Sequence, residues 1–215
     1  RPIPSGRVAG RWGLYIAVIG TVLSLLLAMA LGPLVLAAAA IGLALAWAYS
    51  APPFRLKASG WWGPAVVGLT YEGLSWFTGA AVMLGAMPSM QVLAILLLYS
   101  IGAHGIMTLN DFKAVEGDRA TGLRSLPVTM GVRNASLLAC AVMGGAQILV
   151  VALLLMWGQL LSASIVALLL AGQIALMPRL VRDPAKHAPW YGATSVTLYV
   201  FGMLAAGLGL GGYFG

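Results

Sequence analysis

Charged residues are scarce in this sequence, and acidic ones especially so. Only 8% of the 215 residues are charged, and only five are Asp or Glu. A soluble domain carries about 25% charged residues, so this composition excludes a soluble globular protein. Because 61% of the residues are hydrophobic, the chain is expected to lie in a lipid bilayer.

Cysteine and histidine are also rare. The single cysteine, Cys140, falls inside an apolar run, which excludes a disulfide framework and predicts a small packing residue. The two histidines, His104 and His187, form no candidate catalytic triad.

Long apolar runs fill most of the chain. A helix needs about 20 apolar residues to cross a bilayer. Seven runs approach this length: 12–31, 34–50, 64–85, 90–109, 135–157, 160–177 and 190–211. We therefore expect an all-α fold, a bundle of seven transmembrane helices that forms a single domain over residues 1–215.

The basic residues lie on one side of this predicted bundle. They fall before the first run and in every second connection after it: Arg1, Arg7, Arg11, Arg55, Lys57, Lys113, Arg119, Arg124, Arg133, Arg179, Arg182 and Lys186. The positive-inside rule assigns that side to the cytoplasm. No aromatic residues alternate with the basic ones in a patch, so nucleic acid is not an expected partner.

Three of the five acidic residues, Asp111, Glu116 and Asp118, fall within eight consecutive positions. If the helix of the fourth run continued through them, Asp111 and Asp118 would be about 700° apart and share a face, with Glu116 about 140° away from Asp111. Two such carboxylates suit Mg²⁺ ions bound to a diphosphate, and Glu116 is a weaker ligand candidate. Ordinary solvated loop charges that set topology are the alternative.

Basic side chains near the acidic stretch are candidates for binding phosphate oxygens. They are Lys113, Arg119 and Arg124, together with Arg55 and Lys57 from the preceding cytoplasmic connection. Carboxylates and cations at a membrane surface predict a site for a phosphorylated lipid.

Two polar residues lie inside apolar runs. Glu72 is the only carboxylate well within a span, and intramembrane acids normally face a cavity or the protein interior. It either lines a chamber or is a hydrogen-bonded structural residue. His104 lies about one turn before the cytoplasmic end of its run, and the alternative to a site role is a hydrogen bond to a nearby carbonyl.

Residues 110–119, with 122–128, resemble the second aspartate motif of the UbiA family of intramembrane prenyltransferases, and within it the chlorophyll and bacteriochlorophyll synthases. The resemblance extends to further segments: 1–7, 11–15, 49–57, 59–64, 71–80 and 102–109.

The sequence departs from the family pattern in two ways. UbiA-type enzymes usually carry another Asp at the position of Ala114. Ala114 instead resembles the small residue found there in the chlorophyll branch. The family also has nine helices and a first motif, Asn-Asp-x-x-x-Asp-x-x-x-Asp, just upstream of a segment like residues 1–6. The resemblance thus implies that the seven runs are helices three to nine. We expect the 215-residue chain to be inactive alone, because half of the metal site is missing.

The resemblance implies a prenyltransferase of (bacterio)chlorophyll biosynthesis in a bacterial inner or photosynthetic membrane. It would transfer a C20 group, geranylgeranyl or phytyl, from its diphosphate to the propionate of (bacterio)chlorophyllide, with Mg²⁺ as cofactor. It implies catalytic roles for Asp111, Asp118, Lys113 and Arg119 and a substrate chamber that includes Tyr49, Glu72, His104 and Asn110. A geranylgeranyl reductase or a pigment-binding protein as partner stays open.

Two other functions remain possible at this point. A UbiA-type enzyme of quinone or tocopherol synthesis would prenylate an aromatic ring instead. A seven-helix transporter would need polar or broken helices at the midplane, whereas this chain concentrates its charge at one membrane face.

Overall fold

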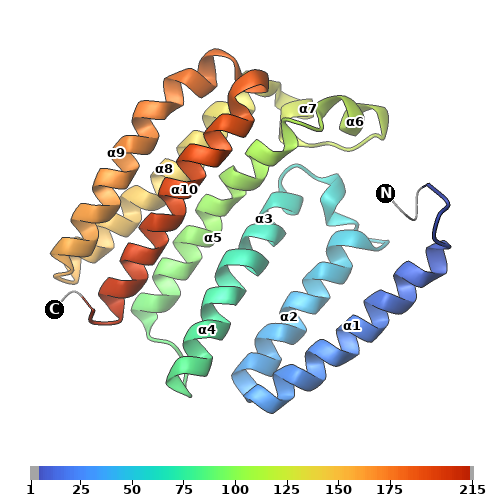
Figure 1. Cartoon of the computed structure of the whole chain (residues 1–215), viewed down its shortest axis with the longest axis horizontal. Helices are drawn as coiled ribbons and strands as arrows, with labels where there is room; N and C mark the ends of the chain where they lie inside the picture. The colour runs from blue at the N-terminus through green and yellow to red at the C-terminus, as the bar shows by residue number, and fades with distance from the viewer. Residues whose placement is uncertain (1–4, 214–215) are drawn as a thin grey trace.

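The structure is a computed structural model that describes residues 5–213. Arg1 to Pro4, which belong to the first similar segment and to the basic residues before the first span, lie outside the described residues. All regular elements of the described part are helices, so the all-α expectation is confirmed (Figure 1).

Within residues 5–213, six helices are long and apolar enough to cross a bilayer: α1 (Gly10–Leu31), α2 (Pro33–Ser50), α5 (Met90–Asp111), α8 (Val132–Met156), α9 (Leu160–Arg182) and α10 (Pro184–Leu210). Four short helices complete the connections and the third predicted span: α3 (Trp62–Gly68), α4 (Ser75–Leu84), α6 (Val115–Ala120) and α7 (Leu126–Met130). A 3₁₀ turn, η1 (Leu56–Ala58), and a π turn, η2 (Leu69–Leu74), lie between them.

The third predicted span is not one regular helix. It consists of α3, η2 and α4, which follow one another along a single rod (Figure 1). Gly68 and Gly73 face Ser100 of α5: a Cβ at Gly68 would lie 2.5 Å from the Ser100 carbonyl oxygen, and one at Gly73 would lie 2.6 Å from its hydroxyl. Close packing of two backbones is a common use of glycine in membrane helices, and here it accompanies the π turn.

The last two helices are longer than expected where they meet, between residues 177 and 190. We predict a connection between residues 177 and 190, but α9 runs to Arg182 and α10 starts at Pro184. Arg179 lies over the ring of Trp190, with its guanidinium carbon 4.3 Å from the ring centroid, and this contact joins the two helix ends. The predicted ends at 177 and 190 are therefore wrong.

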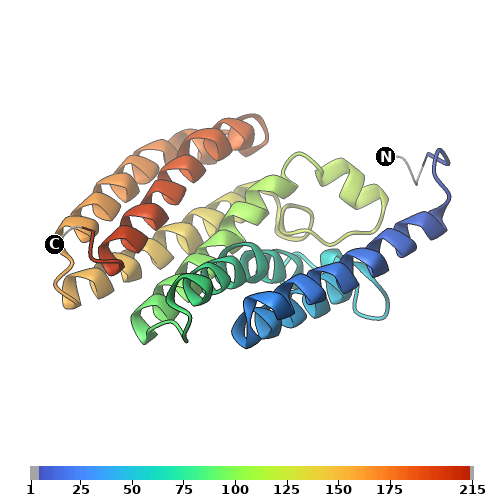
Figure 2. The same ribbon diagram turned by 60° about the horizontal axis from the view of Figure 1, so that its bottom comes forward.

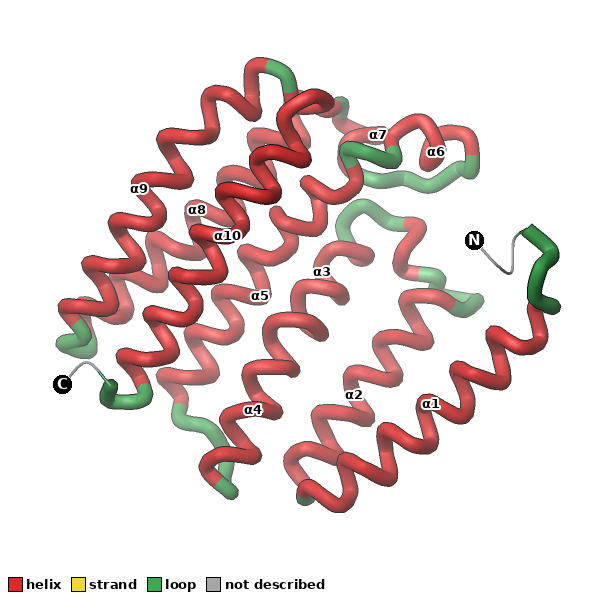
Figure 3. The backbone as a smooth tube through the Cα atoms, viewed as in Figure 1, coloured by secondary structure: helices red, strands yellow, loops and turns green. Residues whose placement is uncertain are grey.

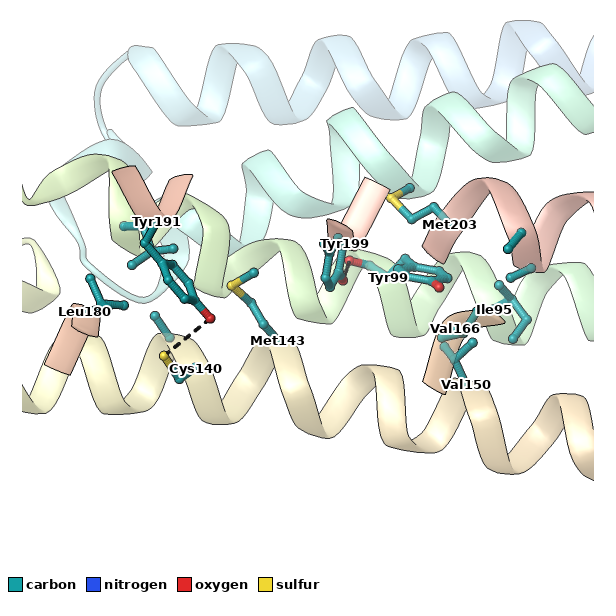
Figure 4. Packing of buried hydrophobic residues seen from close by; sticks show 14 of the residues in the cluster. Ile95, Tyr99, Cys140, Met143, Val150, Val166, Leu180, Tyr191, Tyr199 and Met203 are labelled. Atoms are coloured by element: carbon teal, nitrogen blue, oxygen red, sulfur yellow. Dashed lines mark hydrogen bonds between the residues drawn. The ribbon is translucent and has the colours of Figure 1, made fainter. Parts of the chain in front are cut away.

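Buried side chains concentrate between α5, α8, α9 and α10 (Figure 4). The Tyr199 hydroxyl donates a hydrogen bond of 2.9 Å to the Tyr99 carbonyl oxygen, and the two rings meet edge to face. Cys140 is buried in this core, its thiol 3.9 Å from the Tyr191 hydroxyl, as expected for a packing residue. Helix α1 packs mainly on α2 at the other edge of the bundle.

The two ends of the bundle differ. Figure 3 shows that the segment before α1, the connection from α2 to α3 and the connection from α5 to α8 all lie at one end. The turned view of Figure 2 places α6 at this same end, where α1 begins. This is the end on which the basic residues gather, and we call it the basic end.

Candidate active site

The acidic stretch does not form one helix. Helix α5 ends at Asp111, residues 112–114 form a turn, and α6 begins at Val115. The turn is closed by a 2.9 Å hydrogen bond from the Ala114 N–H to the Asp111 carbonyl oxygen, and Phe112 is buried in the core. The condition for a shared helix face, a helix that continues from Asp111 to Asp118, is therefore not met, because the chain turns where Phe112 is buried.

Asp111 and Asp118 nevertheless line the same cavity, whose volume is about 340 Å³. The turn and α6 bring Asp118 back toward the end of α5, and the two carboxylates are close enough for their charges to interact. Other polar residues in the wall come from the ends of α2 and α5, from the connection after α2 and from the start of α7: Tyr49, Lys57, Ser59, Asn110 and Ser125. Five of the residues singled out from the sequence thus meet in one place.

Apolar residues also line this cavity. Pro64, Val67 and Met107 belong to α3 and α5, and these helices continue into the bundle. The cavity therefore combines a polar mouth at the basic end with apolar walls, an arrangement suited to a lipid that carries an anionic headgroup.

The cavity depends on contact between two segments that are far apart in the sequence. Gly60 donates a backbone hydrogen bond of 2.8 Å to the Arg124 carbonyl oxygen, and the Arg124 N–H donates one of 3.0 Å to the Ala58 carbonyl oxygen. A Cβ at Gly60 would lie 2.5 Å from the Leu126 nitrogen, so only glycine fits there without movement. The two connections form one wall that carries Ser59, Gly60 and Ser125.

Glu116 does not line the cavity and is exposed. It lies two residues before Asp118 in α6, which is about 200° around the helix. When Asp118 faces the cavity, Glu116 therefore faces away from it. The weaker of the three ligand candidates is thus the one that the fold separates from the others.

Four of the five candidate phosphate-binding cations lie outside the cavity. Lys57 lines it, whereas Lys113 borders a neighbouring cavity of about 310 Å³ between α5 and α10. Arg55 and Arg124 line a third cavity of about 480 Å³. Arg119 is exposed on α6. Phosphate binding by these four residues stays a prediction.

Two predicted chamber residues also lie elsewhere. His104 Nε2 is 3.2 Å from the Trp61 carbonyl oxygen, and its ring packs 5.7 Å from the Trp61 ring, in the wall of an apolar cavity between α3 and α5. This is the hydrogen-bonded arrangement that the sequence left as the alternative. Glu72 is half-buried in the π turn η2, away from the cavity wall.

Sequence reasoning missed the serines and the glycine of the wall. Ser59, Gly60 and Ser125 lie in segments that resemble the UbiA family, but nothing in their spacing indicated that they meet. The Ser125 hydroxyl is buried and finds no hydrogen-bond partner among residues 5–213. Ser125 precedes α7 without capping it through its side chain.

The chain is similar in sequence to several known proteins. The chain is 57% identical over 212 residues to the bacteriochlorophyll synthase 33 kDa chain of Cereibacter sphaeroides, covering 99% of this chain and 70% of the relative. It is 44% identical to the 34 kDa chain of Chloroflexus aurantiacus, covering 98% and 67%. The chloroplastic chlorophyll synthase of Avena sativa is 36% identical, with coverage of 97% and 57%.

The fold also matches a solved structure of a digeranylgeranylglyceryl phosphate synthase. The TM-score is 0.74 at 21% identity, with 97% of this chain and 73% of that chain covered. The model of the UbiA prenyltransferase family matches residues 1–195, a range that includes every residue of the cavity. The chain therefore belongs to the UbiA prenyltransferase family.

Proposed function

We propose that this protein transfers a C20 prenyl group from its diphosphate to the propionate carboxylate of bacteriochlorophyllide or chlorophyllide. Three bacteriochlorophyll synthase chains at 44–57% identity over nearly the whole chain support this acceptor over a phenolic one. The observation that carries the chemistry is the meeting of Asp111, Asp118 and Lys57 in one cavity above apolar walls.

The donor set in this cavity fits a hard divalent cation. Its oxygen ligands are two carboxylates, the Asn110 amide and the hydroxyls of Ser59, Ser125 and Tyr49, and no thiolate or imidazole lines this cavity among the described residues. Mg²⁺ prefers such ligands and usually binds one or two carboxylates plus substrate phosphates. No cluster of three or more His, Cys, Asp or Glu occurs within residues 5–213, so oxygens other than carboxylates must complete the coordination.

We assign the metal-binding role to Asp111 and Asp118, and Mg²⁺ is the cation we propose. When bound, it supplies Lewis-acid stabilisation of the charge that develops on the departing diphosphate. Lys57 adds a positive charge at the mouth of the cavity and contacts phosphate oxygens directly.

The transfer breaks the allylic C–O bond of the donor and forms a C–O bond to the acceptor. The bonding electrons leave with the diphosphate, and a propionate oxygen supplies the pair for the new ester bond. The acceptor is already ionised near neutral pH, so the reaction needs no general base, in agreement with a cavity wall that has no histidine. Pro64, Val67 and Met107 shield the reacting carbon from water.

The reaction takes place at the cytoplasmic face in this proposal, because the cavity lies at the basic end and basic residues accumulate on the cytoplasmic side. An acceptor competition tests the function. Membranes that carry the protein, expressed from its full open reading frame, receive labelled geranylgeranyl diphosphate, bacteriochlorophyllide and 4-hydroxybenzoate. Label in the pigment ester supports the proposal, and label in the phenolic acid alone contradicts it.

A further inference from the structure

The cavity lined by Arg55 and Arg124, called the second cavity from here on, shares part of its wall with the cavity of Asp111 and Asp118, which we call the catalytic cavity. It has a volume of about 480 Å³ and lies between the connection after α2 and the segment before α7. Ser59 and Gly60 border both cavities, so little more than the backbone of these residues separates one cavity from the other. The transfer reaction as described makes no use of this second space.

Two arginines give this second cavity its charge. Arg55 and Arg124 line it, and no Asp or Glu does. Neither guanidinium has an ion-pair partner within the described part of the chain. The backbone of Arg124 is fixed by hydrogen bonds to Gly60 and Ala58, and Arg55 adopts a left-handed conformation (φ 42°) that is uncommon for a residue with a Cβ. Two arginine side chains without ion-pair partners in the described residues therefore line one cavity.

Exposed aromatic side chains complete the wall. Phe54, Trp61 and Trp62 line the cavity and are 70%, 55% and 65% exposed. Tryptophan is enriched at the level of lipid headgroups, and Trp62 is the first residue of α3, where the chain enters the bundle. The two arginines thus lie beside aromatic residues of the kind found at the level of lipid headgroups.

The chemistry of this cavity differs from that of the catalytic one. A prenyl diphosphate bound with divalent cations needs carboxylates, which the catalytic cavity supplies and the second cavity lacks. A phosphodiester carries one negative charge and no required metal, and arginine binds phosphate oxygens in a bidentate manner. Basic pockets on the cytoplasmic side of membrane proteins bind such headgroups.

We propose that Arg55 and Arg124, with Trp61 and Trp62, form a binding site for the headgroup of an anionic phospholipid next to the catalytic cavity. The lipid occupies this site independently of the transfer reaction, and it braces the wall that Ser59 and Gly60 share with that cavity.

Lipid retention in the absence of substrates tests the proposal. The full-length protein is reconstituted in nanodiscs of phosphatidylglycerol and phosphatidylcholine in equal parts, and retained lipid is measured by native mass spectrometry. The wild type should retain phosphatidylglycerol, and the double variant R55Q/R124Q should lose this preference by roughly tenfold. The control R133Q/R182Q, which removes two charges from the same membrane face, should keep it.

Two further arms separate charge from geometry and a lipid from a soluble phosphate. R55K/R124K keeps both charges but not the bidentate groups, so an intermediate preference is expected. Inorganic pyrophosphate should not displace the retained lipid. The proposal is overturned by wild-type retention in R55Q/R124Q, by full retention in R55K/R124K, or by displacement with pyrophosphate. Size-exclusion profiles of every variant report folding, and no outcome here depends on whether the protein catalyses prenyl transfer.

Discussion

The backbone N–H of Gly60 lies 2.8 Å from the carbonyl oxygen of Arg124 and donates a hydrogen bond to it. This bond joins the connection after α2 to the connection after α6, and both connections line the cavity that holds Asp111 and Asp118. Asp111 reaches the cavity from the end of α5, Asp118 from α6, and Lys57 from the connection after α2. The geometry of the site therefore depends on how closely the two backbones approach.

A methyl group at position 60 should disrupt this junction. In Gly60→Ala the new Cβ would lie 2.7 Å from the Arg124 carbonyl oxygen and 2.5 Å from the Leu126 nitrogen. We expect a loss of stability of about 1–3 kcal/mol and a fall in transfer activity, because the wall must move. The midpoint of thermal unfolding in detergent measures the first effect.

Gly117→Ala is the matched control, since a Cβ at this position in α6 meets no atom within 4 Å. Alanine should stabilise this helix by about 0.5–1 kcal/mol. Equal unfolding midpoints for the two alanine variants would show that the Gly60 contact is not a constraint.

Removing either aspartate charge should abolish most transfer. We expect Asp111→Asn and Asp118→Asn each to lower kcat by at least about a hundredfold, because stabilisation of the leaving diphosphate is lost. Glu116→Gln should remain close to wild type, because Glu116 is exposed and lies outside the cavity wall. Initial rates of ester formation in membranes that carry each variant decide the point. A loss in Glu116→Gln as large as that in Asp118→Asn would place Glu116 among the ligands.

Lys57 is the one candidate phosphate-binding cation in the cavity wall among the described residues. Lys57→Met should raise the KM for the prenyl diphosphate by about ten- to a hundredfold. This factor corresponds to the free energy of a hydrogen bond to a charged group. The KM for the pigment acid should change little. Arg119→Met is the control, because Arg119 is exposed on α6. A larger effect of Arg119→Met than of Lys57→Met would reverse the assignment.

A buried pair of glutamines between α8 and α9 lies away from the site, so its contribution to stability can be measured separately. The side-chain amides of Gln147 in α8 and Gln173 in α9 exchange two hydrogen bonds of 3.0 Å, and both residues are fully buried. Gln147→Leu leaves the Gln173 amide without this partner, so we expect a loss of about 1–2 kcal/mol. The double variant Gln147→Leu with Gln173→Leu should be more stable than either single variant. A double-mutant cycle on unfolding midpoints checks this, and strict additivity would contradict it.

The sequence predicted the spans well where apolar composition alone decides them. The fourth run, expected at 90–109, is α5 from Met90 to Asp111. The third was predicted as one helix, but its π turn accompanies the packing of Gly68 and Gly73 on Ser100, a contact between distant segments that hydropathy does not contain.

The sequence placed Asp111 and Asp118 together on the condition of a shared helix face, and the structure does not meet that condition. Asp111 and Asp118 line one cavity, but through a turn at 112–114 and not through one helix face. The division of the cations between cavities was not predictable, because Arg124 takes its position from a backbone contact with Gly60. Such pairing between loops leaves no periodic signal in a sequence.

The central claim is that the Asp111 and Asp118 carboxylates hold a divalent cation that the transfer requires. The most direct test measures ester formation from a C20 prenyl diphosphate and bacteriochlorophyllide. Membranes that carry the protein, expressed from its full open reading frame, are first treated with a chelator and then titrated with Mg²⁺. We predict that chelation stops ester formation, that Mg²⁺ restores it, and that Asp118→Asn requires more Mg²⁺ for half-maximal rate. Ester formation that continues unchanged after chelation, or an Mg²⁺ requirement that is the same in Asp118→Asn and the wild type, would contradict the account.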